Sequence, residues 1–222
     1  MGSTPLPYVI SWGHLGHKIS NDENSVHDLL EKKREFVGKF HSLRQEFGKQ
    51  DPRVYMKLIK IYLLHLYGCS MWDIYSNETI PLWSMWHRLI KSLFGLPLPT
   101  HRYLLNEIIE SEHIKKIIIK RFLKFTDTVS SSTNPNLTFL HRVQSRDWRS
   151  TYGRNYMGIC REANVNDIRL VDLSAITVNP VPQDEVWRIN FLNDILDERD
   201  DESAALLSDE ELAQVLHFVC TQ

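Results

Sequence analysis

The stretch from Val54 to Trp72 is the most apolar part of the chain, and it constrains the fold more than any other segment. Its apolar residues recur three and four positions apart, the spacing of one wide buried face on an α-helix. These residues are Leu58, Ile59, Tyr62, Leu63, Leu66 and Tyr67. Pro52 is typical of a helix start and Gly68 of a helix end. Because one partner cannot cover so wide a face, the sequence predicts the central helix of a helical domain.

Helical patterns also occur on both sides of this stretch. The sequence predicts further helices over residues 25–48, 80–94, 100–109, 112–129 and 135–143. Two more follow near the C-terminus, one after Asp184 and one after Ser208, where Ser208 and Glu211 form a capping box. Trp83 and Trp86 lie on the predicted 80–94 helix and are expected to be core anchors.

Strand-forming residues occur at the N-terminus. The run from Pro7 to Trp12, closed by Gly13 and Gly16, predicts a short β-hairpin. The fold class is therefore mainly α: a multi-helix bundle with a short N-terminal β-hairpin and a small helical C-terminal extension. The polar stretch 145–156 has no period and is expected to be a surface loop. Its arginines alternate with Trp and Tyr, which also suits stacking on single-stranded bases.

The order of several short motifs is informative. His14-Leu15-Gly16 precedes the apolar stretch, which ends in Tyr67-Gly68 and is followed by Trp72. Later in the chain come Trp86, Arg88, Leu96-Pro97, His101 and the run 121–125. In this order, the motifs over residues 10–150 resemble the palm edge and thumb of non-LTR retrotransposon reverse transcriptases. Residues 212–221 are similar to the end of such polyproteins.

The resemblance implies four segments and a function. The segments are a palm-edge strand or hairpin at 1–20, a thumb-like helical domain at 21–129, a connector with short helices at 130–164 and an acidic C-terminal extension at 165–222. The chain would be a truncated region of an RNA-directed DNA polymerase. In this family one catalytic carboxylate lies in an aromatic-X-Asp-Asp box on the palm, and no acidic pair here has that context. We therefore expect no catalytic residue, no metal site, no cofactor and no polymerase activity from this chain alone.

The charges divide the chain into two parts. Residues 1–154 hold 22 Lys and Arg against 14 Asp and Glu, whereas residues 155–222 hold 4 against 14. This asymmetry suggests an anion-binding front part and an acidic tail. In a polymerase thumb, basic side chains face the phosphates of an RNA or RNA–DNA duplex, because neutralised phosphates release counterions. The candidate nucleic-acid-binding residues are Lys32, Lys33, Arg34, Lys39 and Arg44 on one helix, and Lys115, Lys116, Lys120, Arg121 and Lys124 on another.

Other interpretations stay open. The basic residues also suit ordinary exposed helix positions, and the acidic tail then folds back on them. A helical protein-interaction module would dock a protein partner through its Trp-rich helix or its acidic tail. A retroelement remnant would have no function. No apolar run is long enough to cross a bilayer and no secretory signal is present, so we expect an intracellular protein without a membrane partner. The sequence does not choose between nucleus and cytoplasm.

Overall fold

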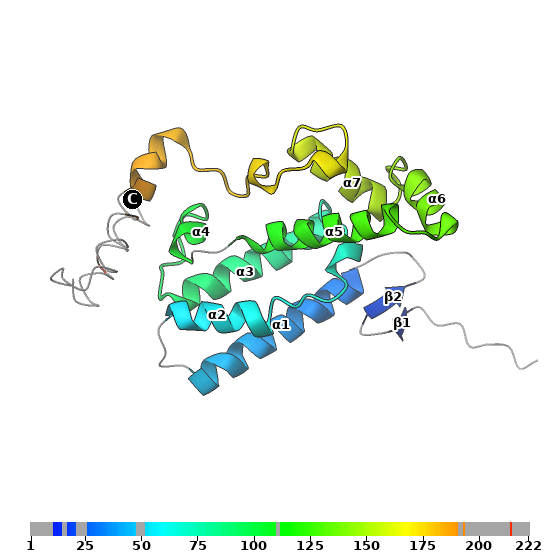
Figure 1. The fold of residues 1–222 in the computed structure, drawn as a ribbon. Coiled ribbons are helices and arrows are strands. Elements are labelled where there is room, and N and C mark those ends of the chain that lie inside the picture. The colour runs from blue at the N-terminus through cyan, green and yellow to red at the C-terminus, as the bar shows by residue number, and fades with distance from the viewer. Residues whose placement is uncertain are drawn as a thin grey trace, which may run out of the picture.

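The computed structural model describes residues 11–14, 17–20, 26–47, 52–109 and 112–190, together with residues 193 and 214. Within these ranges the chain is mainly helical, as Figure 1 shows. The α-helices are α1 (Val26–Phe47), α2 (Pro52–Tyr62), α3 (Ile80–Leu93), α4 (Leu104–Ile108), α5 (Ile114–Ser130), α6 (Pro135–Gln144) and α7 (Thr151–Glu162). The predicted multi-helix bundle with a short N-terminal hairpin is confirmed.

The hairpin consists of β1 (Ser11–His14) and β2 (His17–Ser20), which pair antiparallel with Trp12 opposite Ile19. Gly13 lies inside β1, opposite Lys18, and does not close the strand as predicted. The predicted strand residues 7–10 lie outside the described residues. Because two strands alone are marginally stable in water, the hairpin needs a neighbour, and β2 lies against α1.

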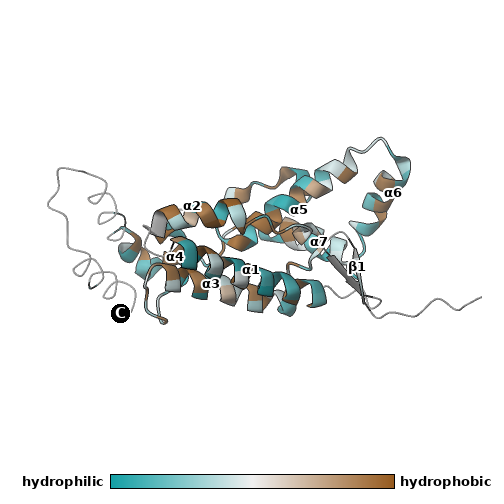
Figure 2. Ribbon diagram, turned by 90° about the horizontal axis from the view of Figure 1, so that it is seen from below, coloured by the Kyte–Doolittle hydropathy of each residue, from teal (hydrophilic) through white to brown (hydrophobic). Residues whose placement is uncertain are grey.

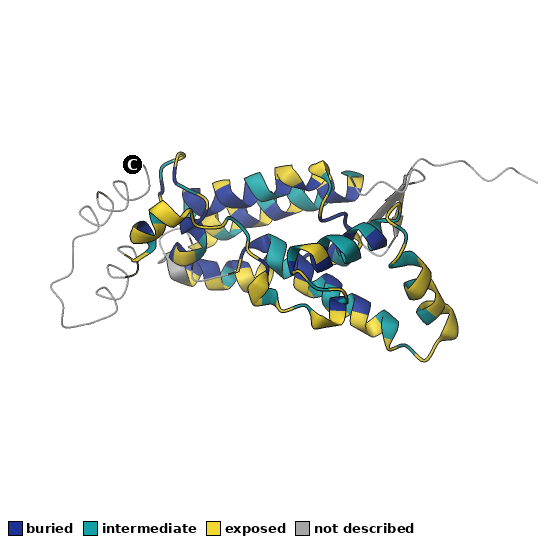
Figure 3. Ribbon diagram, turned by 90° about the horizontal axis from the view of Figure 1, so that it is seen from above, coloured by how far each residue is buried: buried dark blue, intermediate teal, exposed yellow. Residues whose placement is uncertain are grey.

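The centre of the bundle is α3, not the apolar stretch after residue 53. This helix packs against α1, α4 and α5. Its Trp86 and Ile90 are fully buried, which confirms Trp86 as a core anchor, and Trp83 packs half-buried at the edge of the core. Figure 2 shows the apolar residues of α2, α3 and α5 in brown, and Figure 3 shows the buried ones in dark blue.

The central helix, which the sequence predicted to start near Pro52 and to end at Gly68, ends at Tyr62. The chain then continues through turns, where the guanidinium of Arg121 on α5 donates hydrogen bonds to the carbonyl oxygens of Leu64 and His65. The carbonyl groups at the end of a helix have no hydrogen-bond donor within the helix. Arg121 supplies donors to carbonyl groups just after the end of α2. The predicted buried face forms in part: Ile59, Leu63 and Leu66 are buried, whereas Tyr62 and Tyr67 are exposed.

Part of the stretch 145–156, which the sequence predicted to be a loop, forms a helix. The stretch 145–156 contains the first half of α7, which begins after Ser150 with a hydrogen bond from the Gly153 N–H to Ser150 Oγ. The inward face of this half includes Gly153 and the fully buried Asn155. Because neither residue is apolar, no helical period is visible in the sequence there.

The buried amide of Asn155 joins α7 to the chain before α3. Its Oδ1 accepts from the Ile74 N–H at 2.9 Å, and its Nδ2 donates to the Trp72 carbonyl at 2.7 Å. The indole of Trp72 donates in turn to Asp28 of α1 at 2.8 Å. One core cluster extends from Leu29 of α1 to Ile176 and includes residues on both sides of positions 129 and 164.

After α7 the chain runs back along the upper side of the bundle in Figure 1. It contains 3-10 helices at Ile168–Leu170, Leu173–Ala175 and Gln183–Glu185, followed by helical residues 186–190. This is the described part of the predicted C-terminal extension. The predicted acidic turn at 197–202 and the last helix after Ser208 lie outside the described residues.

Candidate nucleic-acid interface

The solvent side of α5 carries three lysines in one line. The buried side of this helix consists of Ile114, Ile118, Ile119, Phe122 and Thr126. Lys116, Lys120 and Lys124 follow each other at intervals of four residues, which places them one above another on the opposite side. Lys120 and Lys124 are exposed, and Lys116 is half-buried. We call these three residues the lysine stripe.

The two other candidates on α5, Lys115 and Arg121, are bound to groups of the protein itself. The Nζ of Lys115 lies 3.0 Å from both carboxylate oxygens of Glu162 and 5.0 Å from the centre of the Tyr75 ring. The Tyr75 hydroxyl also donates to Glu162, at 2.7 Å. Burial raises the pKa of Tyr75, so the phenol stays a neutral donor. Arg121 binds two carbonyl groups. Both cations are therefore engaged by the protein itself, and both residues are half-buried.

The candidates on α1 do not form one basic face. Lys32 pairs with Glu35 at 3.2 Å, and Arg44 donates to the Ser92 hydroxyl of α3 at 2.7 Å. Arg34 and Lys39 are exposed, but five residues of helix separate their directions by about 140°. Lys33, the fifth candidate, is half-buried. The structure thus brings together only the lysine stripe from the ten predicted residues.

A polar pocket of about 720 Å³ lies between the end of α5, α6, α7 and the 3-10 helix at 168–170. Three arginines line it: Arg142, Arg146 and Arg169. The guanidinium groups of Arg142 and Arg146 have no hydrogen-bond or ion-pair partner in the described part of the chain. Arg142 and Arg169 are not among the predicted binding residues, and Arg146 lies in the stretch predicted to be a surface loop. Their only signal was a group of arginines around the end of a predicted helix.

The third arginine of the polar pocket is already neutralised. Arg169 Nε lies 3.1 Å from both carboxylate oxygens of Asp167. These bonds lower the pKa of Asp167 to about 2, so the pair is fully ionised at neutral pH. His141 also lines the pocket, and burial lowers its pKa, so the ring is neutral at pH 7. The positive charge of the pocket therefore comes from Arg142 and Arg146.

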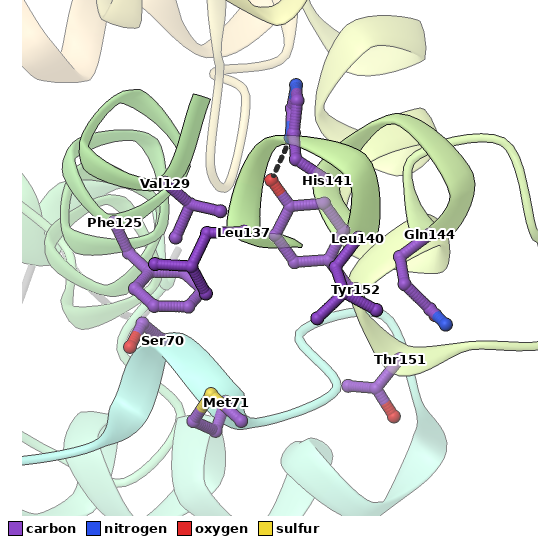
Figure 4. Close-up of a pocket in the computed structure, with 10 residues that line it drawn as sticks. All are labelled: Ser70, Met71, Phe125, Val129, Leu137, Leu140, His141, Gln144, Thr151 and Tyr152. Carbon is purple, nitrogen blue, oxygen red and sulfur yellow. Dashed lines mark hydrogen bonds between the residues drawn. The ribbon is translucent and has the colours of Figure 1, made fainter. Parts of the chain in front are cut away.

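An apolar groove of about 300 Å³ lies beside α6, and Figure 4 shows its lining. Its lining includes Phe125 of α5, Leu137 and Leu140 of α6 and Tyr152 of α7. The Tyr152 hydroxyl is hydrogen-bonded to His141 at 2.7 Å. No residue of α6 is buried, and Leu140 is 50% exposed. Figure 3 shows α6 largely in yellow. This apolar surface is uncovered within the described ranges.

Two buried histidines meet at the start of α5, where His113 caps the helix and contacts His87 of α3. Nδ1 of His113 accepts from the Lys115 N–H at 3.0 Å, and its Nε2 lies 3.0 Å from Nε2 of His87. Because Nδ1 accepts, the neutral His113 ring holds its proton on Nε2 and donates it to His87. The two rings are 2% and 6% exposed. The start of the helix that carries the lysine stripe therefore depends on neutral imidazoles.

Acid is expected to destabilise the protein through this pair. Burial lowers the pKa of His87 to about 4 and that of His113 to about 3. An unfolded chain binds the same protons near pH 6.5, so it holds more protons than the folded chain below that pH. The neutral pair should therefore contribute its full stabilisation above about pH 6.5, and the free energy of unfolding should decrease steadily as the pH falls towards 4. Urea titrations at several pH values measure this slope.

The control for this prediction is His113→Asn. Asparagine keeps a side-chain acceptor at the start of α5 but does not titrate. The variant should lose less unfolding free energy than the wild type between about pH 7 and pH 5. An identical pH slope in both proteins would contradict the assignment.

Among the residues that the structure describes, no three His, Cys, Asp or Glu side chains are grouped to hold a metal ion. None of the described helices combines the length and the apolar character that a membrane span needs.

No protein-family model, curated protein or solved structure matches this chain.

Proposed function

We propose that this chain binds nucleic acid through the lysine stripe on α5. The observation that carries the proposal is the alignment of Lys116, Lys120 and Lys124 on the solvent side of one helix. The resemblance to the thumb and C-terminal extension of non-LTR reverse transcriptases supplies the ligand class, an RNA or RNA–DNA duplex. In this proposal the chain is a polymerase region without its catalytic palm, and it grips a duplex without extending it.

The stripe has the spacing and freedom that phosphate contacts need. Successive lysines are about 6 Å apart along the helix axis, so each can reach a separate phosphate. Lys120 lies 3.6 Å from Glu112, but both side chains are about half exposed or more. A pair of this kind is weak and yields readily to a phosphate. Three neutralised phosphates correspond to a slope of about −3 in a plot of log affinity against log salt concentration.

The combined substitutions Lys116→Glu, Lys120→Glu and Lys124→Glu are expected to abolish most of this binding. Fluorescence anisotropy with a short RNA–DNA hybrid, at roughly 50 and 200 mM salt, measures affinity and salt slope together. The slope of log affinity against log salt concentration should become less negative by about 3 in the variant. Lys115 and Arg121 stay unchanged, because their loss would disturb the fold and not the surface alone.

The matched control makes the same change in net charge on α1, with Lys33→Glu, Arg34→Glu and Lys39→Glu. These three side chains point in different directions, so their loss should weaken binding less. An equal loss in both variants would mean that only net charge matters and that the stripe is not a site. No binding by the wild type at low salt would remove the proposal altogether.

A second candidate function, a helical protein-interaction module, is favoured by the apolar groove beside α6. A partner helix could place apolar side chains there. On the Trp-rich helix α3, Trp86 is buried in the core and Trp83 is half-buried, so this helix offers less apolar surface than the groove. The acidic tail, the other suggested docking segment, lies mostly outside the described residues. Leu140→Asp should weaken binding of a protein partner and leave nucleic-acid binding unchanged.

A further inference from the structure

Two of the three arginines that line the polar pocket are unpaired, whereas several arginines near it are bound to groups of the protein. Arg121 is bound to carbonyl groups, and Arg154 lies 2.6 Å from the carboxylate of Asp73. Arg169 is paired with Asp167. Arg142 and Arg146 remain without a partner among the described residues, and both face the same concave pocket. Unpaired guanidinium groups in a pocket select an anion that accepts several hydrogen bonds.

The pocket supplies a further donor beside these arginines. The Tyr156 oxygen accepts from the Ile168 N–H at 3.5 Å, which leaves the phenol proton for another acceptor. Burial raises the pKa of Tyr156, so the proton is retained at neutral pH. One carboxylate, that of Asp127, lines the pocket on the α5 side. With Arg169 neutralised by Asp167, the two arginines and Asp127 leave a balance of one positive charge, which matches one singly charged phosphate diester.

The pocket also continues the lysine stripe. Asp127 on its rim lies three residues after Lys124, on the same side of α5. A strand whose phosphates follow the stripe towards the end of α5 therefore reaches the pocket. We propose that the polar pocket binds a phosphate group through Arg142 and Arg146. This inference rests on the proposed function in one respect, the source of the phosphate, which is then the bound nucleic-acid strand.

Calorimetric titration of the full chain with inorganic phosphate, at constant ionic strength, tests the pocket directly. Saturable binding is expected in the wild type. The double variant Arg142→Gln, Arg146→Gln should lose about tenfold or more in affinity, because hydrogen bonds to a charged group are lost. Both side chains are exposed, so the fold is kept, and a thermal unfolding curve checks this. Arg142→Lys with Arg146→Lys should bind with intermediate affinity, since lysine keeps the charge but not the planar fork.

Arg149→Gln is the matched control. Its guanidinium lies 5.7 Å from the Trp148 ring, and it does not line the pocket. This variant should bind phosphate like the wild type. Absence of saturable binding in the wild type, or equal affinities in the double variant and the wild type, would overturn the proposal.

Competition experiments separate the two sources of phosphate. If a single-stranded oligonucleotide with a 5′-hydroxyl end displaces inorganic phosphate, the pocket takes a backbone diester. If only a nucleoside monophosphate displaces it, the pocket takes a monoester. Either result supports a phosphate site.

The two proposals also fail separately. In one case the double arginine variant binds both phosphate and the RNA–DNA hybrid with the affinity of the wild type, while the lysine variant loses hybrid binding. Only the pocket proposal is then wrong. If phosphate binds but the hybrid does not, the proposed function is wrong and the phosphate site stands.

Discussion

Gly153→Ala is expected to lower the free energy of unfolding by about 3 kcal/mol. A Cβ atom at this position would lie 2.1 Å from the Asp147 carbonyl oxygen and 2.6 Å from that of Gln144. Both are backbone atoms, one at the last residue of α6 and one in the connection to α7, so the backbone itself must move. The same movement displaces Arg142 and Arg146, and phosphate binding should weaken with stability. Urea unfolding followed by circular dichroism measures the change.

Gly38→Ala provides the matched control for this substitution. Gly38 lies inside α1, is exposed, and a Cβ atom there would meet no atom within 4 Å. Alanine costs less conformational entropy than glycine in a helix, so this variant should gain about 0.5–1 kcal/mol. The two Gly→Ala changes are thus expected to have opposite signs. A neutral or stabilising effect at Gly153 would contradict the close approach of the Gln144 and Asp147 backbone to this residue.

Asn155→Ala is expected to have an effect of similar size, a loss of about 3 kcal/mol. The substitution leaves the buried Ile74 N–H and the Trp72 carbonyl without partners, and each unsatisfied backbone group costs free energy. Asn155→Asp should be no better, because it keeps the acceptor but loses the donor and places a charge in a fully buried site. Thermal and urea unfolding of the variants measure both effects.

An exposed asparagine tests whether the effect comes from burial. Asn136 on α6 is exposed, and Asn136→Ala should change stability by less than about 0.5 kcal/mol. Equal losses at Asn136 and Asn155 would show that the buried amide does not join α7 to the rest of the fold.

Local patterns in the sequence predicted most of the helices. The ranges 25–48, 80–94, 112–129 and 135–143 agree closely with α1, α3, α5 and α6. These helices have apolar residues at helical spacing, and proline or a capping residue near the start, so neighbouring residues are sufficient to define them. The lysine stripe was predictable for the same reason, since three residues at intervals of four share one side of any helix.

Contacts between distant residues decided the rest. Arg121 binds carbonyl groups beyond the end of α2, across 57 and 56 positions in the sequence. Asn155 gives α7 a polar inward face by reaching back 81 and 83 positions. Neither partner is visible as a local pattern, so the sequence overestimated one helix and missed another.

The same division separates the basic residues. The sequence determined that α5 carries five cations, because its composition and helical period are local properties. Tertiary structure decided that Lys115 and Arg121 stabilise the fold while Lys116, Lys120 and Lys124 face outwards. It also brought Arg142, Arg146 and Arg169 into one pocket. A hydrogen bond or ion pair depends on distance in space, which the order of residues fixes only within a helix or a turn.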